Sequence, residues 1–149
     1  MSNGCRGARG SATRARLIAQ LSTINKQLIM AHYVDGYVLP VPKKSIAAYA
    51  RMAKKASKIW KEHGALDYKE CVGDDLDVKM GMPFPRGIKT KPGEAVVFSY
   101  IVYKSRAHRD SVNAKVMKDP RIANMCDPKD MPFDCKRMLY GGFKTIVEA

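Results

Sequence analysis

The sequence lacks several features that would assign it to a specific class of protein. None of its 149 residues lie in a run approaching the ~18 consecutive apolar residues of a membrane-spanning helix, which excludes such a span. Four cysteines, Cys5, Cys71, Cys126 and Cys135, form no CxxC pair. No secretory apolar segment precedes them, so we expect reduced thiols and a cytoplasmic protein. Three scattered histidines have no metal-ligand spacing, and we expect neither a metal site nor a cofactor.

The positive charge is also not concentrated in the way that nucleic-acid-binding segments usually show. The net charge is +13, and residues 1–29 contribute five basic side chains and no acidic one. Over residues 30–149 the remaining basic residues are mixed with all 14 acidic ones. We therefore do not expect a nucleic-acid partner. Residues 1–29 are interpreted as an extension before a single domain at 30–149; a transit peptide and a nucleic-acid-binding arm are the alternatives.

Hydrophobic periodicity predicts an α+β domain. Residues rich in Val, Ile and Tyr indicate four strands, and apolar residues at helical spacing indicate two helices. The strands are expected at 33–41, 65–72, 94–103 and 137–147, the helices at 43–63 and 106–118, and a short extra strand near 84–90. The order is βαββαβ, which is typical of a ferredoxin-like fold: a four-stranded antiparallel sheet with two helices on one face. In the last strand, Gly141-Gly142 predicts a bulge or a close backbone approach.

The strand at 94–103 is apolar on both faces. One set of alternating side chains is Val96, Phe98, Tyr100 and Val102, and the other contains Val97, Ile101 and Tyr103. A sheet with one solvated face normally places polar residues at one of the two sets. We therefore expect a second layer on the far face, supplied by an identical chain, so that the protein is a homodimer.

Ordered motifs along residues 30–149 resemble the YbaA-like bacterial family of unknown function, in the dimeric α+β barrel superfamily. They include Tyr33-Val34-Asp35-Gly36-Tyr37, Glu70-Cys71, Phe84-Pro85-Arg86, Val96-Val97-Phe98-Ser99, Arg109-Asp110, Asp119-Pro120-Arg121, Met131-Pro132-Phe133-Asp134 and Tyr140-Gly141-Gly142-Phe143. Residues 1–29 have no counterpart in that family. The resemblance implies the same fold and a dimer, and it implies no catalytic residues.

Two groups of charged residues are candidate ligand-binding sites. Asp35 lies in the first strand, next to the expected position of Arg137 and Tyr140 on the last, as an ion pair or a pocket element. Glu70, Asp74 and Asp75 cluster at the end of the second strand, where a loop at 73–93 starts; oxygen ligands for a cation and a solvated strand end are the alternatives.

Two helices supply the remaining candidates. Arg109 follows the N-cap Ser105, where it would bind an anion or pair with an aspartate such as Asp134. Trp60, with Tyr49, faces the sheet from the first helix, as core or as the wall of a cavity.

These candidates predict a small-molecule site at the rim formed by the 73–93 loop or in a cavity between helices and sheet. A non-catalytic interaction module is an alternative. So is a cofactor-free monooxygenase or isomerase, an idea that depends on fold analogy. RNA binding would need the same sheet face as the dimer.

Overall fold

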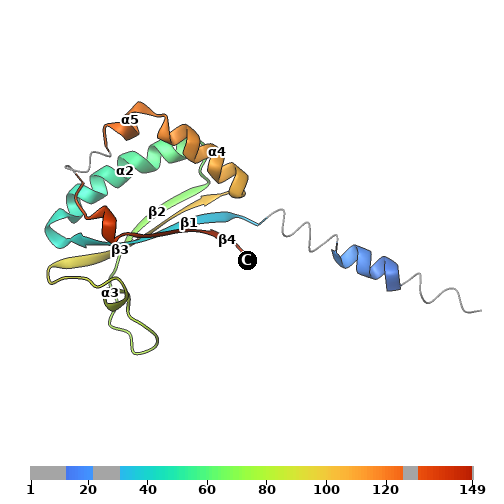
Figure 1. Cartoon of the computed structure of the whole chain (residues 1–149), viewed down its shortest axis with the longest axis horizontal. Coiled ribbons are helices and arrows are strands. Elements are labelled where there is room, and N and C mark those ends of the chain that lie inside the picture. The colour runs from blue at the N-terminus through green and yellow to red at the C-terminus, as the bar shows by residue number, and fades with distance from the viewer. Residues whose placement is uncertain (1–12, 22–30, 126–130, 149) are drawn as a thin grey trace, which may run out of the picture.

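The computed structural model describes residues 13–21, 31–125 and 131–148 (Figure 1). A helix at 13–21 precedes the domain in the sequence. The domain elements, in chain order, are β1 (Tyr33–Pro42), η1 (Lys43–Ser45), α2 (Ile46–Glu62), β2 (Asp67–Val72), α3 (Phe84–Gly87), β3 (Glu94–Tyr103), α4 (Arg106–Met117), α5 (Pro120–Ala123), η2 (Cys135–Arg137) and β4 (Leu139–Lys144). No helix within these described ranges is long and apolar enough to cross a membrane.

The four strands form one antiparallel sheet in the order β2-β3-β1-β4. β1 pairs with β3 along ten residues, from Tyr33 opposite Tyr103 to Pro42 opposite Glu94. Its other edge pairs with β4, so Asp35 lies opposite Gly142. The expected α+β class and the four antiparallel strands are confirmed.

Helices α2 and α4 lie on one face of this sheet (Figure 1). α2 buries Tyr49, Ala53 and Ile59 at helical spacing. The chain leaves this helix through Gly64, whose φ of +114° is a conformation that favours glycine. α4 begins as expected, because the Ser105 side chain accepts a hydrogen bond from the His108 backbone N–H at 3.2 Å.

Two apolar clusters make up the core between helices and sheet. One joins Ile101 and Tyr103 of β3 to Val112 and Val116 of α4. The other joins Leu39 and Val41 of β1 to α2. Side chains of alternate strand residues supply both clusters, and the remaining residues of each strand point to the opposite face.

The opposite face is mostly apolar and at least partly exposed over much of its area in the described part of the chain, and it also carries the charged pair Asp67 and Lys69 of β2. Phe98, Leu139 and Phe143 project from it and are 43%, 56% and 60% exposed. Segment 73–93, including α3, lies on this side of the sheet (Figure 1) and covers only its end near Val96, which is buried. We refer to the remainder as the open sheet face.

Two predicted strands differ from the structure. Residues 84–87 form the short helix α3 rather than a strand, because Pro85 has a fixed φ that suits the first turn of a helix. The last strand begins at Leu139 rather than 137, because the Asp134 side chain accepts from the Lys136 N–H and caps a 3₁₀ turn. It ends at Lys144 rather than 147.

Candidate functional site

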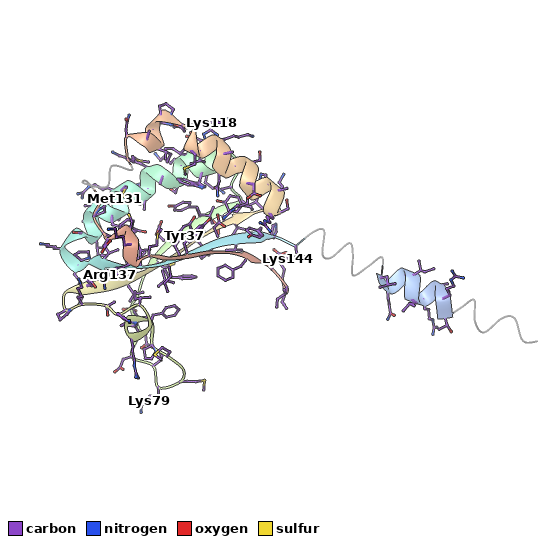
Figure 2. All side chains as sticks on the ribbon, viewed as in Figure 1. Tyr37, Lys79, Lys118, Met131, Arg137 and Lys144 are labelled. Carbon is purple, nitrogen blue, oxygen red and sulfur yellow. The ribbon has the colours of Figure 1, made fainter. Side chains whose placement is uncertain are left out.

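A cavity of about 220 Å³ lies between the sheet and α2, and we call it the helix–sheet cavity. Tyr37 projects from the sheet toward the helices on this side (Figure 2). Aromatic, methionine and aliphatic side chains make up most of the lining, which comprises Tyr37, Leu39, Tyr49, Met52, Ala53, Ala56, Trp60, Tyr68, Glu70, Ser99, Ile101, Ile122, Met125, Met131, Phe133 and Met138. Within the described chain, Glu70 is the only acidic lining residue, and no lysine, arginine or histidine is among them.

Glu70 is held by hydroxyl groups from the helix and the sheet. The Tyr49 hydroxyl of α2 donates to Oε2 at 2.7 Å, and the Tyr68 hydroxyl donates to Oε1 at 2.9 Å. Tyr68 is two residues before Glu70 on β2 and therefore shares its face of the sheet, while Ser99 lies opposite Glu70 on β3. This register places the Tyr68 and Ser99 hydroxyl groups beside the carboxylate, and the packing of α2 on the sheet adds that of Tyr49.

Burial raises the pKa of the Glu70 carboxyl above its ordinary value of 4.5. Hydrogen bonds from Tyr49, Tyr68 and Ser99 oppose the shift, because they stabilise the ionised form. Burial, and to a smaller extent the neighbouring Glu70 charge, raises the pKa of Tyr49 and of Tyr68, so both remain hydroxyl donors. Glu70 therefore takes up a proton at a higher pH than an exposed glutamate does.

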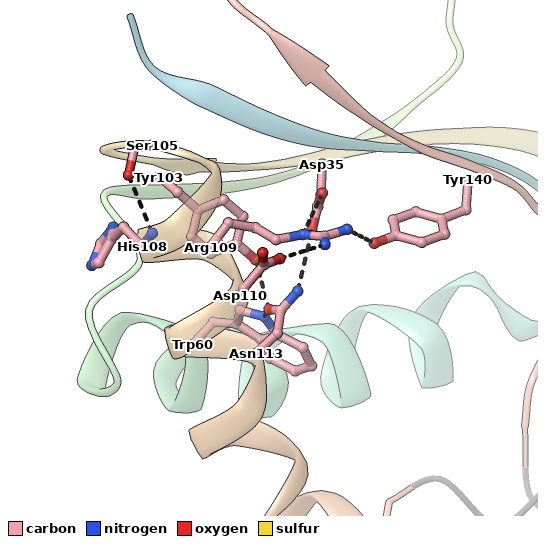
Figure 3. A network of polar contacts seen from close by, with 9 residues as sticks. All are labelled: Asp35, Trp60, Tyr103, Ser105, His108, Arg109, Asp110, Asn113 and Tyr140. Carbon is pink, nitrogen blue, oxygen red and sulfur yellow. Dashed lines mark hydrogen bonds and ion pairs between the residues drawn. The ribbon is translucent and has the colours of Figure 1, made fainter. Parts of the chain in front are cut away.

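A second polar group, centred on Asp35 and Arg109, lies beside the cavity (Figure 3). Asp35 is fully buried, and Arg109 Nε of α4 approaches its two carboxylate oxygens at 2.9 and 3.0 Å. Asn113 Nδ2 adds a contact at 3.3 Å. The other guanidinium nitrogens donate to Asp110 and to the Tyr140 hydroxyl. Hydrogen bonding to Asp35 raises the pKa of Arg109, so its guanidinium stays protonated at any ordinary pH.

The Asp35–Arg109 group positions two walls of the cavity. Tyr140 stacks on Tyr37, with ring centroids 4.7 Å apart and planes 16° apart. Asn113 Oδ1 accepts from Trp60 Nε1 at 3.1 Å and from the Tyr103 hydroxyl at 3.0 Å. The lining rings of Tyr37 and Trp60 therefore have their orientations fixed by residues outside the cavity.

Arg137 does not pair with Asp35, so that expectation is wrong. It lies in η2, before β4 begins, and forms an ion pair with Glu94 at 2.5 Å and donates to the Lys89 carbonyl at 2.7 Å. Arg109 takes its place beside Asp35, and Asp134 caps η2 instead of pairing with Arg109.

Asp75 does not accompany Glu70, which faces the helices. Asp75 is exposed and belongs to segment 73–93, a segment that lies on the opposite side of the sheet from α2 and α4 (Figure 1). Within the described residues, no group of three or more His, Cys, Asp or Glu side chains is arranged so that it could hold a metal ion.

The structure brings Glu70 and Trp60 into one cavity, and Asp35, Arg109 and Tyr140 into the adjoining group; their ligand-binding roles stay predictions. Tyr49 and Trp60 face the sheet as expected. The sequence analysis missed Tyr68, Ser99 and Asn113. The alternation of β2 and β3 could have indicated the first two, but nothing in the sequence pairs Asn113 with Trp60.

Comparison with known proteins gives the family of this chain. Residues 32–135 match a family described as "Protein of unknown function (DUF1428)". The chain belongs to this family. It is 44% identical over 116 residues to "Uncharacterized protein YbaA" of Escherichia coli strain K12. The aligned region covers 78% of this chain and 97% of that protein. A YbaA protein of Shigella flexneri matches with the same identity and coverage.

The expected YbaA-like resemblance is thus confirmed, and DUF1428 membership assigns no activity. Among solved structures, the de novo designed protein Foldit4 covers 78% of this chain and 99% of its own, at 11% identity and a TM-score of 0.38. That score is too low to support any argument about fold or function.

Proposed function

We propose that this DUF1428 protein binds a small, largely apolar molecule in the helix–sheet cavity. The observation that carries the proposal is a cavity of about 220 Å³ with an apolar lining and one partly buried carboxylate. A closed apolar cavity of ~150 Å³ holds benzene, so this one has room for a ring with a short substituent. Ligand sites commonly combine such walls with few polar groups.

The cavity is a better site than the rim formed by the 73–93 segment. That segment lies on the other side of the sheet from Glu70, and its Asp75 is exposed. Arg137, the other rim candidate, is already paired with Glu94. We therefore assign the ligand to the space beneath α2.

A homodimer with a ferredoxin-like, dimeric α+β barrel arrangement is the second part of the proposal. Its support is the open sheet face, where Phe98, Leu139 and Phe143 are exposed together. Burying each of these side chains would contribute roughly 1.5–3 kcal/mol. A second copy is the simplest cover, because symmetric homodimers are the commonest oligomers. This use of the face would leave no aromatic platform for RNA.

We also propose a cytoplasmic location. Among the described residues, Cys71 and Cys135 are both free and exposed, which suits a reducing compartment.

The ligand proposal is tested by screening small ring compounds against the full-length protein by ligand-observed NMR and calorimetry. Ala56 lines the cavity, so the larger side chain of Ala56→Leu fills part of it. This variant should bind any compound found in the screen with an affinity lower by at least about tenfold. Ala50→Leu is the matched control, because Ala50 is exposed on the same helix and lines no described cavity. A broad panel with no binder, or equal binding to both variants, would contradict the proposal.

A further inference from the structure

Among the described residues, the helix–sheet cavity contains a carboxylate with no basic side chain beside it. Glu70 accepts from the Tyr49 and Tyr68 hydroxyl groups, and the described lining includes no basic side chain. A desolvated carboxylate is costly unless it is both hydrogen-bonded and paired with a charge. The three surrounding hydroxyl groups supply the hydrogen bonds, so the missing component is a positive charge.

Aromatic rings surround this carboxylate on both sides. Tyr49 packs edge-on against Phe133 with ring centroids 5.6 Å apart, and Tyr68 packs against Trp60 at 6.2 Å. Both tyrosines that hold Glu70 therefore belong to aromatic pairs. Rings of Trp, Tyr and Phe attract organic cations through their π-faces, an interaction worth about 0.5–2 kcal/mol for each suitable contact.

We infer that the ligand of the helix–sheet cavity is a small organic amine, bound as its ammonium ion against Glu70 with its carbon frame among the aromatic rings. The inference rests on the proposed ligand-binding function and specifies its chemical class. A single carboxylate with aromatic walls suits an ammonium ion better than a metal ion, which needs several oxygen ligands. An anionic ligand would add a like charge beside Glu70.

Of the described basic residues, four on α2 lie near the cavity but outside it. Arg51, Lys54, Lys55 and Lys58 line a separate groove on the outer side of α2, which shares Met52 and Met125 with the cavity lining. These four side chains are exposed, so salt screens them over ~10 Å or less. We expect them to slow the arrival of a cation at low ionic strength, without supplying a partner to Glu70.

The protonation of Glu70 gives the inference a pH signature. The raised pKa of this carboxyl means that acid neutralises Glu70 before it neutralises exposed carboxylates. Amines remain charged in acid, so their affinity should fall as Glu70 takes up a proton, whereas a neutral ligand of the same shape should be little affected.

The test measures the binding of matched amine and alcohol pairs, such as benzylamine with benzyl alcohol and cyclohexylamine with cyclohexanol, by calorimetry. Wild-type protein should bind the preferred amine at least about tenfold more tightly than its alcohol. Glu70→Gln, which keeps the shape of the side chain, should remove this preference. Asp75→Asn, which neutralises an exposed carboxylate outside the cavity, should retain it.

Lowering the pH from about 8 to about 4.5 should weaken the binding of the amine and leave the binding of the alcohol unchanged. This measurement uses wild-type protein alone. Equal binding within every pair, tighter binding of the alcohols, or an amine preference that survives in Glu70→Gln would overturn the inference while leaving ligand binding intact. If no compound of any pair binds, the inference is overturned. A wider panel of neutral compounds then tests separately whether the cavity binds a ligand.

Discussion

At the scale of single residues, the most consequential feature is the burial of Asp35. Its side chain is fully buried beneath Arg109, whose own side chain is 21% exposed and also contacts the face of Tyr33, with 5.7 Å between the guanidinium carbon and the ring centroid. Because Asp35 relies on this one cation, its charge would be left without a counter-ion if Arg109 were removed. The pair therefore couples the central strand β1 to α4.

Replacing Arg109 with methionine should lower the free energy of unfolding by about 3–5 kcal/mol, because it leaves a buried carboxylate uncompensated. The double variant Asp35→Asn/Arg109→Met should recover part of this loss, since the charge is gone as well. Chemical denaturation measures both values. Glu62→Gln, which alters an exposed ion pair with Arg121, is the control and should change stability by less than about 1 kcal/mol. An equally small effect of Arg109→Met would show that Asp35 does not depend on its partner.

At the scale of elements, the pairing of β4 with β1 depends on a residue without a side chain. The register runs without interruption from Tyr33 opposite Lys144 to Val38 opposite Leu139, so the glycine pair forms no bulge. A Cβ on Gly142 would instead lie 2.3 Å from the Tyr33 hydroxyl oxygen and 2.8 Å from its ring. The expectation of a bulge or a close backbone approach is therefore wrong at Gly142, because the atoms nearest to it belong to the Tyr33 side chain.

Gly142→Ala should therefore destabilise the protein by about 1–3 kcal/mol, because the Tyr33 ring must move away from its packed position. Gly87→Ala in α3 is the matched control, since its added Cβ would lie 3.8 Å from Met82 Cγ, an ordinary van der Waals contact. Thermal unfolding of the two variants makes the comparison. If both melt at the wild-type temperature, Tyr33 adjusts freely and the close contact is not a constraint.

At the scale of the whole molecule, the sheet is covered unequally. One face carries α2 and α4 (Figure 1), whereas Phe98, Leu139 and Phe143 are exposed on the open sheet face. Soluble monomers rarely expose contiguous apolar patches of this kind. The proposed dimer would bury this patch and leave the helix–sheet cavity of each chain on its own side of the sheet.

Phe143→Lys should convert the dimer to a monomer, because it places a charge in the proposed apolar interface. Light scattering coupled to gel filtration measures the mass of each species. Met117→Lys is the control, because Met117 is 62% exposed at the end of α4, away from the open sheet face. A monomeric wild-type protein would contradict the dimer, and a variant that stays dimeric would place the interface elsewhere.

Much of the fold could be predicted from local patterns alone. The strand at Glu94–Tyr103 has the expected bounds, and α2 and α4 differ from their predicted ranges only near their ends. Such elements show strong apolar periodicity or a clear cap, which are properties of neighbouring residues. Segment 84–90 was assigned wrongly because a few apolar residues carry no decisive period, and a proline then favours a turn of helix.

The candidate site was only partly predictable, because its contacts join distant parts of the chain. Asp35 was correctly placed near the last strand, but its partner Arg109 is 74 residues away on α4. Strand pairing fixes neighbours along a sheet, whereas a long side chain that crosses from a helix depends on the packing of layers. Proximity in sequence groups Asp75 with Glu70, yet Glu70 lines the helix–sheet cavity whereas Asp75 is exposed and is not part of that lining.

By itself, the sequence determined the α+β class, the strand that is apolar on both faces and the membership of a family without an assigned activity. These properties follow from alternation, helical spacing and ordered motifs, which are local. Only the tertiary structure decided that Glu70 faces the aromatic rings of α2 and that Asp35 pairs with Arg109. Both outcomes depend on how helices lie across the sheet, since that packing determines which distant side chains share the space between the layers.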